Sequence, residues 1–346
     1  MPRSPAAKQR PPLLIDLALQ GGGAHGAFTW GVLDRLLEEP WLTVEGISGT
    51  SAGAMNAAAM AAGHAQGGPV GARASLDRFW RSVSDAARLS PFQRSPLDRL
   101  QGRWTLDQSP MFIAMDLASR LFSPYDLNPG GLNPLRDVLA ECIDFAALAA
   151  APIKLFITAT NVRTGRGRVF RNAELTPEVL LASACLPTLF QAVEIDGEPY
   201  WDGGYSGNPT LTPLVKKCEA GDTLVVPITP VERPAPPRPA REILNRLNEV
   251  SFNSATLKEL RMIALLRRVA DPGAGEGAAW ASMRIHLIRN EGMVELGYSS
   301  KLNAEWEFLT MLRDRGRAAA AAFLTEHGAD LGRRSTLDLD PLLEGV

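Results

Sequence analysis

LALQGGGAHGAF, residues 17–28, joins a short apolar run to a segment of helical periodicity through a glycine-rich loop. Residues 13–19 are apolar enough to form a buried strand. Apolar residues then recur at helical spacing over 28–37, until Pro40 ends the pattern. The sequence therefore predicts a strand, a glycine loop and a helix in succession, which is the repeating unit of an α/β fold.

The glycine loop has two interpretations. Gly21, Gly23 and Gly26 have the G-x-G-x-x-G spacing of dinucleotide-binding loops, which also need an acidic ribose ligand about 20 residues further on. Glu45 is the nearest acidic residue for that role, but it does not end a convincing second strand. The consecutive glycines 21–23 equally fit a loop whose backbone N–H groups face a developing oxyanion, and such a site needs a nucleophile on another tight turn.

A second strand, turn and helix follow directly. The motif GTSAG lies between a predicted strand over 42–48 and a predicted helix of small residues over 54–62. The sharp turn of a G-x-S-x-G sequence leaves little room for side chains at Gly49 and Gly53, and it lifts the Ser51 hydroxyl clear of the sheet. The N-terminus of the following helix favours negative charge beside the serine. Ser51 is therefore the predicted nucleophile.

Ser51 needs a base, because a free serine hydroxyl is a weak nucleophile. An ordinary α/β-hydrolase uses a histidine late in the chain, and His286 and His327 are available by order alone. His286 lies inside an apolar strand pattern and His327 beside a glycine at a helix end, which favours core packing or helix capping. Asp202 follows a predicted strand and precedes two glycines, so its carboxylate is the predicted proton acceptor.

The rest of the chain continues to alternate strands and helices. Thr176 and Pro177 form a well-built helix start, and Asp196-Gly197 predicts a turn between two short strands. The alternation predicts an α/β fold with three layers, α/β/α, and a mainly parallel central sheet, whose catalytic groups lie at the carboxyl ends of strands. Further strands are predicted over 153–162, 223–229 and 283–289, with a hairpin turn at Gly165, and helices over 241–269 and 302–326.

Residues 63–131 differ in composition from their surroundings. They contain glycines, prolines and scattered aromatic residues but no strand pattern. Within them, Met111–Phe122 predicts a moderately amphipathic helix, which fits either packing onto the core or an apolar cap over an acyl channel. We expect a disordered lead-in over 1–12, a catalytic core over 13–230 with the cap-like insertion 63–131, and a mostly helical extension over 231–346 packed on the same domain.

Bulk composition excludes several classes of protein. The chain has 346 residues, of which 45% are hydrophobic and 21% charged, and its formal net charge of −2 gives no general attraction to nucleic acid. No apolar run approaches the length of a membrane span, and residues 13–19 are too short for a signal-peptide core. These features predict a cytoplasmic protein that binds no nucleic acid, and they leave peripheral contact with a membrane open.

Cysteine and histidine spacing predicts no metal site. The three cysteines form no C-x-x-C pair, which argues against a disulfide framework and a cysteine-rich zinc site. The four histidines include no H-E-x-x-H and no pair four residues apart. We therefore expect reduced thiols and neither a metal nor an organic cofactor. The residues concerned are Cys142, Cys185, Cys218, His25, His64, His286 and His327.

The motifs together resemble a known family. GGGAHG, GTSAG and DGG occur in the order and approximate spacing of the patatin-like phospholipases, and ASACLPTLFQAVEIDGEPYWDGGYSGNP looks like the bacterial branch. The resemblance covers 13–230 well and the C-terminal third only weakly. It implies a patatin-like fold, a dyad of Ser51 as nucleophile and Asp202 as base without histidine, and an oxyanion hole formed by Gly21, Gly22 and Gly23.

His25 departs from the family pattern. The family's glycine loop usually reads GGGxRG, with a basic residue that assists the oxyanion, whereas His25 stands at that position here. A neutral histidine stabilises negative charge less than arginine, and a protonated one would make the rate depend on pH near neutrality. Support of the oxyanion and a purely structural role both stay open for His25. With the resemblance, the oxyanion interpretation of the loop is favoured over the dinucleotide one.

The expected protein is a serine acyl hydrolase of the lipid esterase or phospholipase A type. It would hydrolyse carboxylic esters of lipids through an acyl-enzyme, without a cofactor. A transacylase, a thioesterase or a polyester depolymerase would use the same dyad, and a nucleotide-binding or lipid-binding module is the alternative from another class. Acyl-chain length, head group, positional selectivity and oligomeric state are left open by the sequence.

Overall fold

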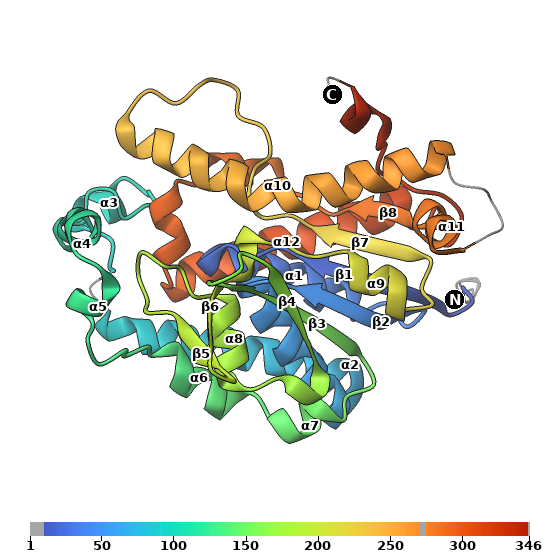
Figure 1. Cartoon of the computed structure of the whole chain (residues 1–346), viewed down its shortest axis with the longest axis horizontal. Helices are drawn as coiled ribbons and strands as arrows, with labels where there is room; N and C mark the ends of the chain where they lie inside the picture. The colour runs from blue at the N-terminus through green and yellow to red at the C-terminus, as the bar shows by residue number, and fades with distance from the viewer. Residues whose placement is uncertain (1–9, 91, 270–274, 345–346) are drawn as a thin grey trace, which may run out of the picture.

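A computed structural model describes residues 10–90, 92–269 and 275–344. Its centre is one eight-stranded sheet in the order β5-β6-β3-β2-β1-β7-β8, with β4 paired to β3 (Figure 1). The neighbouring strands β3, β2, β1, β7 and β8 pair in parallel. The strands β4 and β6 pair antiparallel with β3, and β5 pairs antiparallel with β6. The mainly parallel sheet predicted from the sequence is confirmed.

The strands begin and end close to the predicted positions. A strand over 42–48 was expected and is found one residue longer, and the run 223–229 forms a strand only as far as Val226. The strands are β1 (Leu13–Leu19), β2 (Leu42–Gly49), β3 (Lys154–Asn161), β4 (Gly167–Arg171), β5 (Val193–Ile195), β6 (Glu198–Asp202), β7 (Asp222–Val226) and β8 (Arg284–Leu287).

Helices account for most of the remaining chain. The α-helices are α1 (Gly26–Leu36), α2 (Ala52–Ala86), α3 (Pro96–Leu100), α4 (Pro110–Leu121), α5 (Pro124–Leu127), α6 (Leu135–Cys142), α7 (Phe145–Ala149), α8 (Pro177–Ser183), α9 (Thr212–Lys217), α10 (Ala240–Val269), α11 (Gly275–Ser282) and α12 (Trp306–His327). The 3-10 helices used below are η1 (Gly23–His25), η4 (Gly203–Tyr205) and η6 (Tyr298–Leu302).

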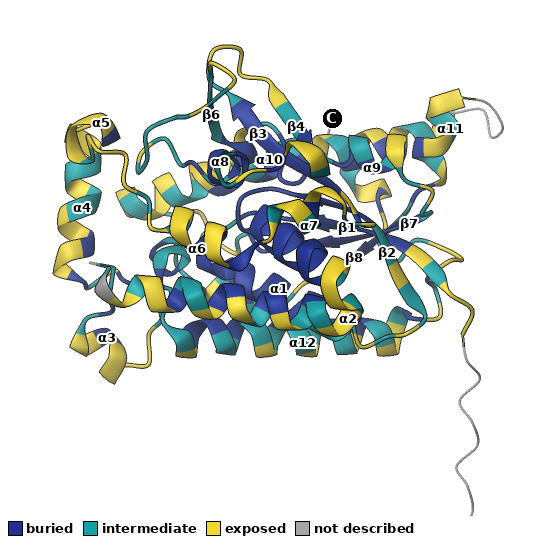
Figure 2. Ribbon diagram, turned by 90° about the horizontal axis from the view of Figure 1, so that it is seen from below, coloured by how far each residue is buried: buried dark blue, intermediate teal, exposed yellow. Residues whose placement is uncertain are grey.

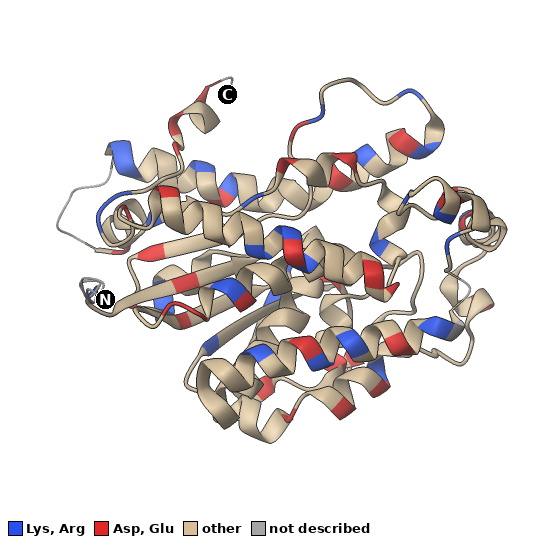
Figure 3. Ribbon diagram, turned by 180° about the vertical axis from the view of Figure 1, so that it is seen from behind, with Lys and Arg blue, Asp and Glu red and all other residues tan. Residues whose placement is uncertain are grey.

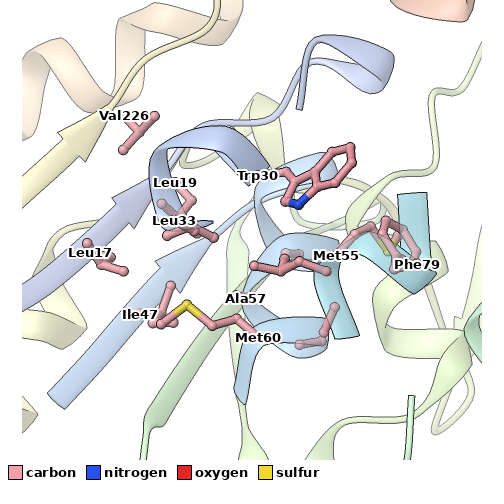
Figure 4. Packing of buried hydrophobic residues seen from close by; sticks show 14 of the residues in the cluster. Leu17, Leu19, Trp30, Leu33, Ile47, Met55, Ala57, Met60, Phe79 and Val226 are labelled. Atoms are coloured by element: carbon pink, nitrogen blue, oxygen red, sulfur yellow. The ribbon is translucent and has the colours of Figure 1, made fainter. Parts of the chain in front are cut away.

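One face of the sheet forms the larger core with α1, α2 and α12. Leu17 and Leu19 of β1 alternate toward this face, because successive side chains of a strand point to opposite sides. Figure 4 shows them close to Leu33 of α1 and Ile47 of β2, with Met60 of α2 beside Ile47. The helices α1 and α12 approach closely at a glycine, since a methyl group built on Gly316 would lie 2.0 Å from the carbonyl oxygen of α1 residue 28.

The opposite face forms a second core with α9, α10 and α11. Ala18 of β1 and Val225 of β7 point to this side, next in sequence to residues that enter the larger core. Leu260 and Ile263 of α10 and Trp280 of α11 cover them. Helices therefore lie on both faces of the sheet, and the predicted three-layer arrangement is confirmed (Figure 1).

The second helix is much longer than predicted. The sequence predicts a helix of small residues over 54–62. In the structure α2 runs to Ala86 and is broken only at Gly67 and Gly68, whose backbone angles are not helical. The part after the break carries Phe79 and Trp80 into the larger core. At the start of the segment 63–131, Gly67, Gly68 and Pro69 thus mark a kink within α2. Proline is tolerated there because it lies in the first turn of the helical segment that follows the kink.

The segment α3 to α5 lies at one end of the molecule, and Figure 2 colours much of it as exposed. The exposed residues of this segment include apolar ones. Phe112 of α4 is buried, whereas Met111, Leu117 and Leu121 on the same helix are exposed by 50%, 59% and 71%. Packing onto the core therefore does not explain why α4 carries these exposed apolar side chains. No helix among residues 10–90, 92–269 and 275–344 is both long and apolar enough to cross a membrane.

Ion pairs join the helices of the large core at the surface. Asp34 of α1 pairs with Arg73 of α2 and Arg317 of α12, and Figure 3 shows acidic and basic residues interspersed along the helices on that view. Near the N-terminus, Arg10 donates to the Gly328 carbonyl. Residues 1–9 of the predicted lead-in lie outside the described residues, and the division of the chain into core, insertion and extension stays a prediction.

Candidate active site

Ser51 lies on a sharp turn between β2 and α2. Its backbone has φ of +53°, a conformation that is uncommon for a residue with a side chain and characteristic of a strained strand-to-helix turn. The turn also brings Gly53 against β1, because a methyl group built there would lie 2.1 Å from the Leu19 carbonyl oxygen. Only glycine fits at that point, which is the role predicted for Gly53. Gly49 is also tightly packed, although less so, with a built methyl group 2.8 Å from the Gly53 backbone.

Hydrogen bonds from a distant helix hold the turn in place. The Ser51 N–H donates to Ser183 Oγ at 2.9 Å, and that hydroxyl donates to the Thr158 carbonyl at 2.7 Å. The Thr50 hydroxyl donates to the Gly207 carbonyl at 2.7 Å. The strained turn is therefore fixed by α8 and by the segment after Asp202, so that the Ser51 side chain has a defined direction.

Asp202 ends β6 and is buried, with an exposed fraction of 1%. Its Oδ1 accepts a hydrogen bond of 2.7 Å from the Gly204 N–H. Burial raises the pKa of this carboxyl to about 7, although Gly204, the Ser51 hydroxyl and Lys301 each lower it. A carboxylate with a pKa near neutrality is suited to accept a proton at physiological pH.

The glycine loop lies beside the turn that carries Ser51. A methyl group built on Gly21 would lie 2.7 Å from Ser51 Cβ, so the loop and the turn are in contact. The Gly21 N–H donates to Asn208 Oδ1 at 2.7 Å and is thus already occupied. Among the described residues we find no acceptor for the N–H groups of Gly22 and Gly23. Of the three predicted oxyanion donors, these two are free to bind a ligand.

One cavity brings the predicted residues together. Gly21, Gly22, Gly23, Ser51 and Asp202 all line it, although they come from three separate parts of the sequence. Gly49 and Gly53 are not among the lining residues and instead shape the turn behind Ser51. The parallel sheet explains this convergence, because β1 and β2 end at the same edge and β6 reaches that edge through its pairing with β3.

The other wall of the cavity was not predicted. Its lining includes Phe252 of α10, Tyr298 and Lys301 of η6, and Tyr205 of η4. Phe252 and Tyr205 are in contact, with ring centroids 5.0 Å apart. These residues carry no local motif, and they reach the site only because the C-terminal third folds back over the sheet. Sequence spacing offered no signal for them.

His25 is buried and does not line the cavity. Its Nε2 is 2.7 Å from Ser300 Oγ, and its ring packs edge-on against Phe308. Burial lowers the pKa of His25 well below its usual value, and nearby Lys301 lowers it further. His25 is therefore neutral at physiological pH, and its contacts tie the glycine loop to η6.

The remaining histidines and acids lie elsewhere. His286 of β8 pairs with Asp222 at 2.9 Å, and Asp222 begins β7, so this pair lies at the opposite edge of the sheet from Ser51. The side chains of Asp16, Glu45 and Cys218 place three atoms of metal-binding type within 4.8 Å of one another, a grouping that the sequence spacing did not predict. Glu45 there accepts a hydrogen bond from Lys154 and two from backbone N–H groups, so its oxygens are already satisfied.

A family model described as patatin-like phospholipase matches residues 17–215, more than half of the chain. The chain belongs to this family. The match confirms the resemblance that was inferred from three short motifs. Members of the family are lipid acyl hydrolases. The matched part contains the glycine loop, Ser51 and Asp202, and it excludes α10, η6 and α12.

Among solved structures, VipD from Legionella pneumophila is similar, with 15% sequence identity and a TM-score of 0.41; the match covers 92% of this chain and 67% of that one. No curated protein matches the sequence. The assignment to the patatin-like phospholipases therefore rests on the match over residues 17–215.

Proposed function

We propose that this patatin-like protein is a serine acyl hydrolase that cleaves carboxylic esters of lipids through an acyl-Ser51 intermediate. The observation that carries the proposal is the cavity in which Ser51, Asp202 and the unoccupied N–H groups of Gly22 and Gly23 meet. Nucleophile, base and oxyanion donors are the three components that acyl transfer requires. Histidine is not needed in this arrangement, because Asp202 itself accepts the proton.

The reaction proceeds in two steps. Asp202 takes the hydroxyl proton of Ser51 while Oγ attacks the ester carbonyl carbon, and the resulting oxyanion accepts hydrogen bonds from Gly22 and Gly23 N–H. The carbon–oxygen bond to the alcohol then breaks, and the proton on Asp202 passes to the departing alkoxide. In the second step Asp202 takes a proton from a water molecule, whose oxygen attacks the acyl carbon of the acyl-serine. The bond from that carbon to Ser51 Oγ then breaks, the proton on Asp202 returns to Oγ, and the fatty acid is released. Replacement of water by another acceptor would give a transacylase with the same dyad.

Covalent labelling of Ser51 by a fluorophosphonate tests the proposal. We expect one adduct on the peptide that contains Ser51, because the reagent reacts only with an activated serine. Ser51→Ala should lose the label completely, whereas Ser282→Ala, which alters an exposed serine on α11, should be labelled like the wild type. Intact and peptide-level mass spectrometry provides the measurement. A folded wild-type protein that stays unlabelled beside a labelled control hydrolase would refute the dyad and favour a nucleotide-binding or lipid-binding module.

We also propose peripheral contact with a lipid surface through α4 and α5. Met111, Leu117 and Leu121 are exposed there, as are Phe122 and Tyr125. An exposed apolar patch of this kind marks an interaction site in a monomeric protein. The helix α4 is joined to α10 by the pairing of Asp116 with Arg241.

Contacts just before α4 connect this surface to the cavity. The Leu106 N–H donates to Ser299 Oγ in η6, and Ser299 Oγ donates to Asp107. On the other side, Arg241 of α10 pairs with Asp107 and Asp116. Because η6 and α10 both contribute residues to the cavity wall, these contacts join α4 to two elements of the candidate site.

Charge on the exposed face of α4 should weaken binding to lipid vesicles. The double variant Leu117→Asp/Leu121→Asp removes two exposed apolar side chains, and we expect its partition onto phosphatidylcholine vesicles to fall by about 10-fold or more. Hydrolysis of a water-soluble short-chain ester should change by less than about twofold, because neither residue lines the cavity. Vesicle sedimentation gives the measurement. Val70→Asp, at an equally exposed apolar residue of α2, is the matched control; equal binding by all three proteins would rule out α4 as the lipid-facing surface.

A further inference from the structure

Lys301 lies directly against the glycine loop. Its carbonyl oxygen is 2.4 Å, and its Cβ 3.4 Å, from the position that a methyl group on Gly23 would occupy. Gly23 has φ of +59°, so both its backbone conformation and this close approach require glycine. The contact places the base of the Lys301 side chain beside one of the two proposed oxyanion donors.

Lys301 is one of the residues that line the cavity, and it is partly buried. Its Nζ lies 5.8 Å from the ring centroid of Tyr298, which lines the same cavity. Among the described residues around this cavity, Lys301 is the one cation and Asp202 the one carboxylate. Lys301, Asp202 and Ser51 therefore line the same cavity.

The other charged and titratable groups near this pair come from every adjoining element. Glu249 of α10 and Arg233, which lies between β7 and α10, act on Lys301, but Glu249 is already paired with Arg233 and Arg246. Burial lowers the pKa of Lys301, Glu249 and Asp202 raise it, and Arg233 lowers it. The neutral groups that sense the same field are His25 of η1, Tyr205 of η4, Tyr298 of η6 and Cys185.

The proposed reaction creates negative charge twice in this space: first as the Asp202 carboxylate that must form before attack, then as the oxyanion on the substrate. His25 cannot balance either charge, because it is neutral and bonded to Ser300. We infer that Lys301 supplies the positive charge of the active site, which favours the ionised form of Asp202 and stabilises the oxyanion beside Gly23. The inference rests on the proposed function and assigns a role to a residue outside the part of the chain that the family match covers.

Two effects should follow from removal of this charge. Loss of one preorganised oxyanion interaction typically costs about 100- to 1000-fold in turnover, and a partly solvated ammonium at greater distance should contribute less. We therefore expect Lys301→Met to lower kcat by about 10- to 100-fold on an uncharged short-chain ester. Because Lys301 lowers the pKa of Asp202, the same variant should also move the midpoint of the rise of kcat/KM with pH to a higher value.

The experiment compares the wild type with Lys301→Met, Lys301→Gln and Lys301→Arg on an uncharged nitrophenyl ester between pH 5 and 9 (a span about two units either side of neutrality). Lys301→Arg keeps the charge and should retain most of the rate and the wild-type midpoint. Lys258→Met, at an exposed lysine of α10, is the matched control and should behave as the wild type. Thermal unfolding shows that each variant is folded, and the second neutral variant, Lys301→Gln, serves if Lys301→Met does not fold.

The inference is overturned if the neutral variants keep the wild-type midpoint, or if Lys301→Arg loses as much activity as they do. The same proteins are also assayed on a phosphate-bearing ester, and a loss confined to KM for that ester overturns the inference, because Lys301 would then bind a head group. If the wild type hydrolyses no ester, the proposed function fails separately. The effect of Lys301 on Asp202 is then measured through the stability of the protein. The free energy of unfolding falls as the pH rises and stops falling near the pKa of Asp202, so this pH should be higher in Lys301→Met than in the wild type. The difference between the two proteins should vanish when both also carry Asp202→Asn.

Discussion

Asp202→Asn should hydrolyse esters at least about 10⁴-fold more slowly than the wild type and yet unfold at a higher temperature. The loss of activity follows from chemistry, because an amide cannot accept the Ser51 proton while the turn and the glycine loop keep their positions. The hydrogen bond from Gly204 N–H to Oδ1 can persist with the side-chain amide oxygen of asparagine. Both effects come from one property of the site, a carboxyl group held where water cannot solvate its charge.

The gain in stability has a definite pH dependence. Burial raises the pKa of Asp202 from 3.8 to about 7, so between these values the folded protein binds more protons than the unfolded chain. The stability that protonated Asp202 provides is complete below pH 3.8 and is lost as the pH rises to about 7. The free energy of unfolding lost over this range has an upper bound of about 4 kcal/mol. Asparagine carries no charge at any pH. The difference in melting temperature between Asp202→Asn and the wild type should therefore be small near pH 4 and reach a few degrees at pH 7 and above, taking about 1–2 °C per kcal/mol for a chain of this size.

The same carboxyl sets the pH profile of the wild type. Asp202 must be ionised to act as a base, so kcat/KM should rise with pH and level off above about 7. Asp196→Asn is the matched control, because that aspartate is exposed in the turn between β5 and β6. Stopped-flow or steady-state assays of a nitrophenyl ester, with thermal unfolding of the same samples, measure both effects. Full activity in Asp202→Asn would eliminate Asp202 as the base.

The fold was largely predictable because its first units are local. Residues 13–37 contain a strand, a glycine loop and a helix in one continuous stretch, and the GTSAG turn repeats that pattern. Each turn needs glycines for steric reasons that can be stated from the sequence, and the methyl positions of Gly49 and Gly53 confirm the reason. Parallel pairing of β1 with β2 then brings the glycine loop and Ser51 together. Asp202 was predictable because a strand end and two glycines flank it.

The rest of the site depends on contacts between residues far apart in the chain. Lys301 reaches the glycine loop across nearly 280 residues, and the Gly21 N–H is occupied by Asn208, about 190 residues away. Neither contact leaves a pattern in its own neighbourhood, because a lysine in a short 3-10 helix and an asparagine in a loop are common surface features. The length of α2 was missed for a different reason. Gly67, Gly68 and Pro69 are strong loop signals, and only tertiary packing of Phe79 and Trp80 restores a helix after them.

A second buried aspartate, Asp222, has its pKa moved in the opposite direction. It begins β7 at the edge of the sheet away from Ser51, and its side chain is fully buried. Burial alone would raise its pKa, but hydrogen bonds and ion pairing with His286 and Arg284 and a hydrogen bond from the Gly332 N–H lower it to about 2. Ionised Asp222 thus joins two strands to the segment that follows α12.

Asp222→Asn should therefore destabilise the protein, by about 2–4 kcal/mol at pH 7, where Asp202→Asn stabilises it. The asparagine leaves His286 and Arg284 without their buried anion. The stability that ionised Asp222 provides is present above about pH 4 and is lost as the pH falls toward 2, so the difference from the wild type should shrink in that range. Urea unfolding at several pH values measures it, with the exposed Asp340→Asn as control. Ester hydrolysis at a temperature where both proteins are folded should be unchanged, since Asp222 is remote from the cavity. Equal stability of Asp222→Asn and the wild type at pH 7 would show that the paired carboxylate contributes nothing beyond its hydrogen bonds. The opposite pKa shifts of Asp202 and Asp222 would then not be reflected in opposite changes of the free energy of unfolding.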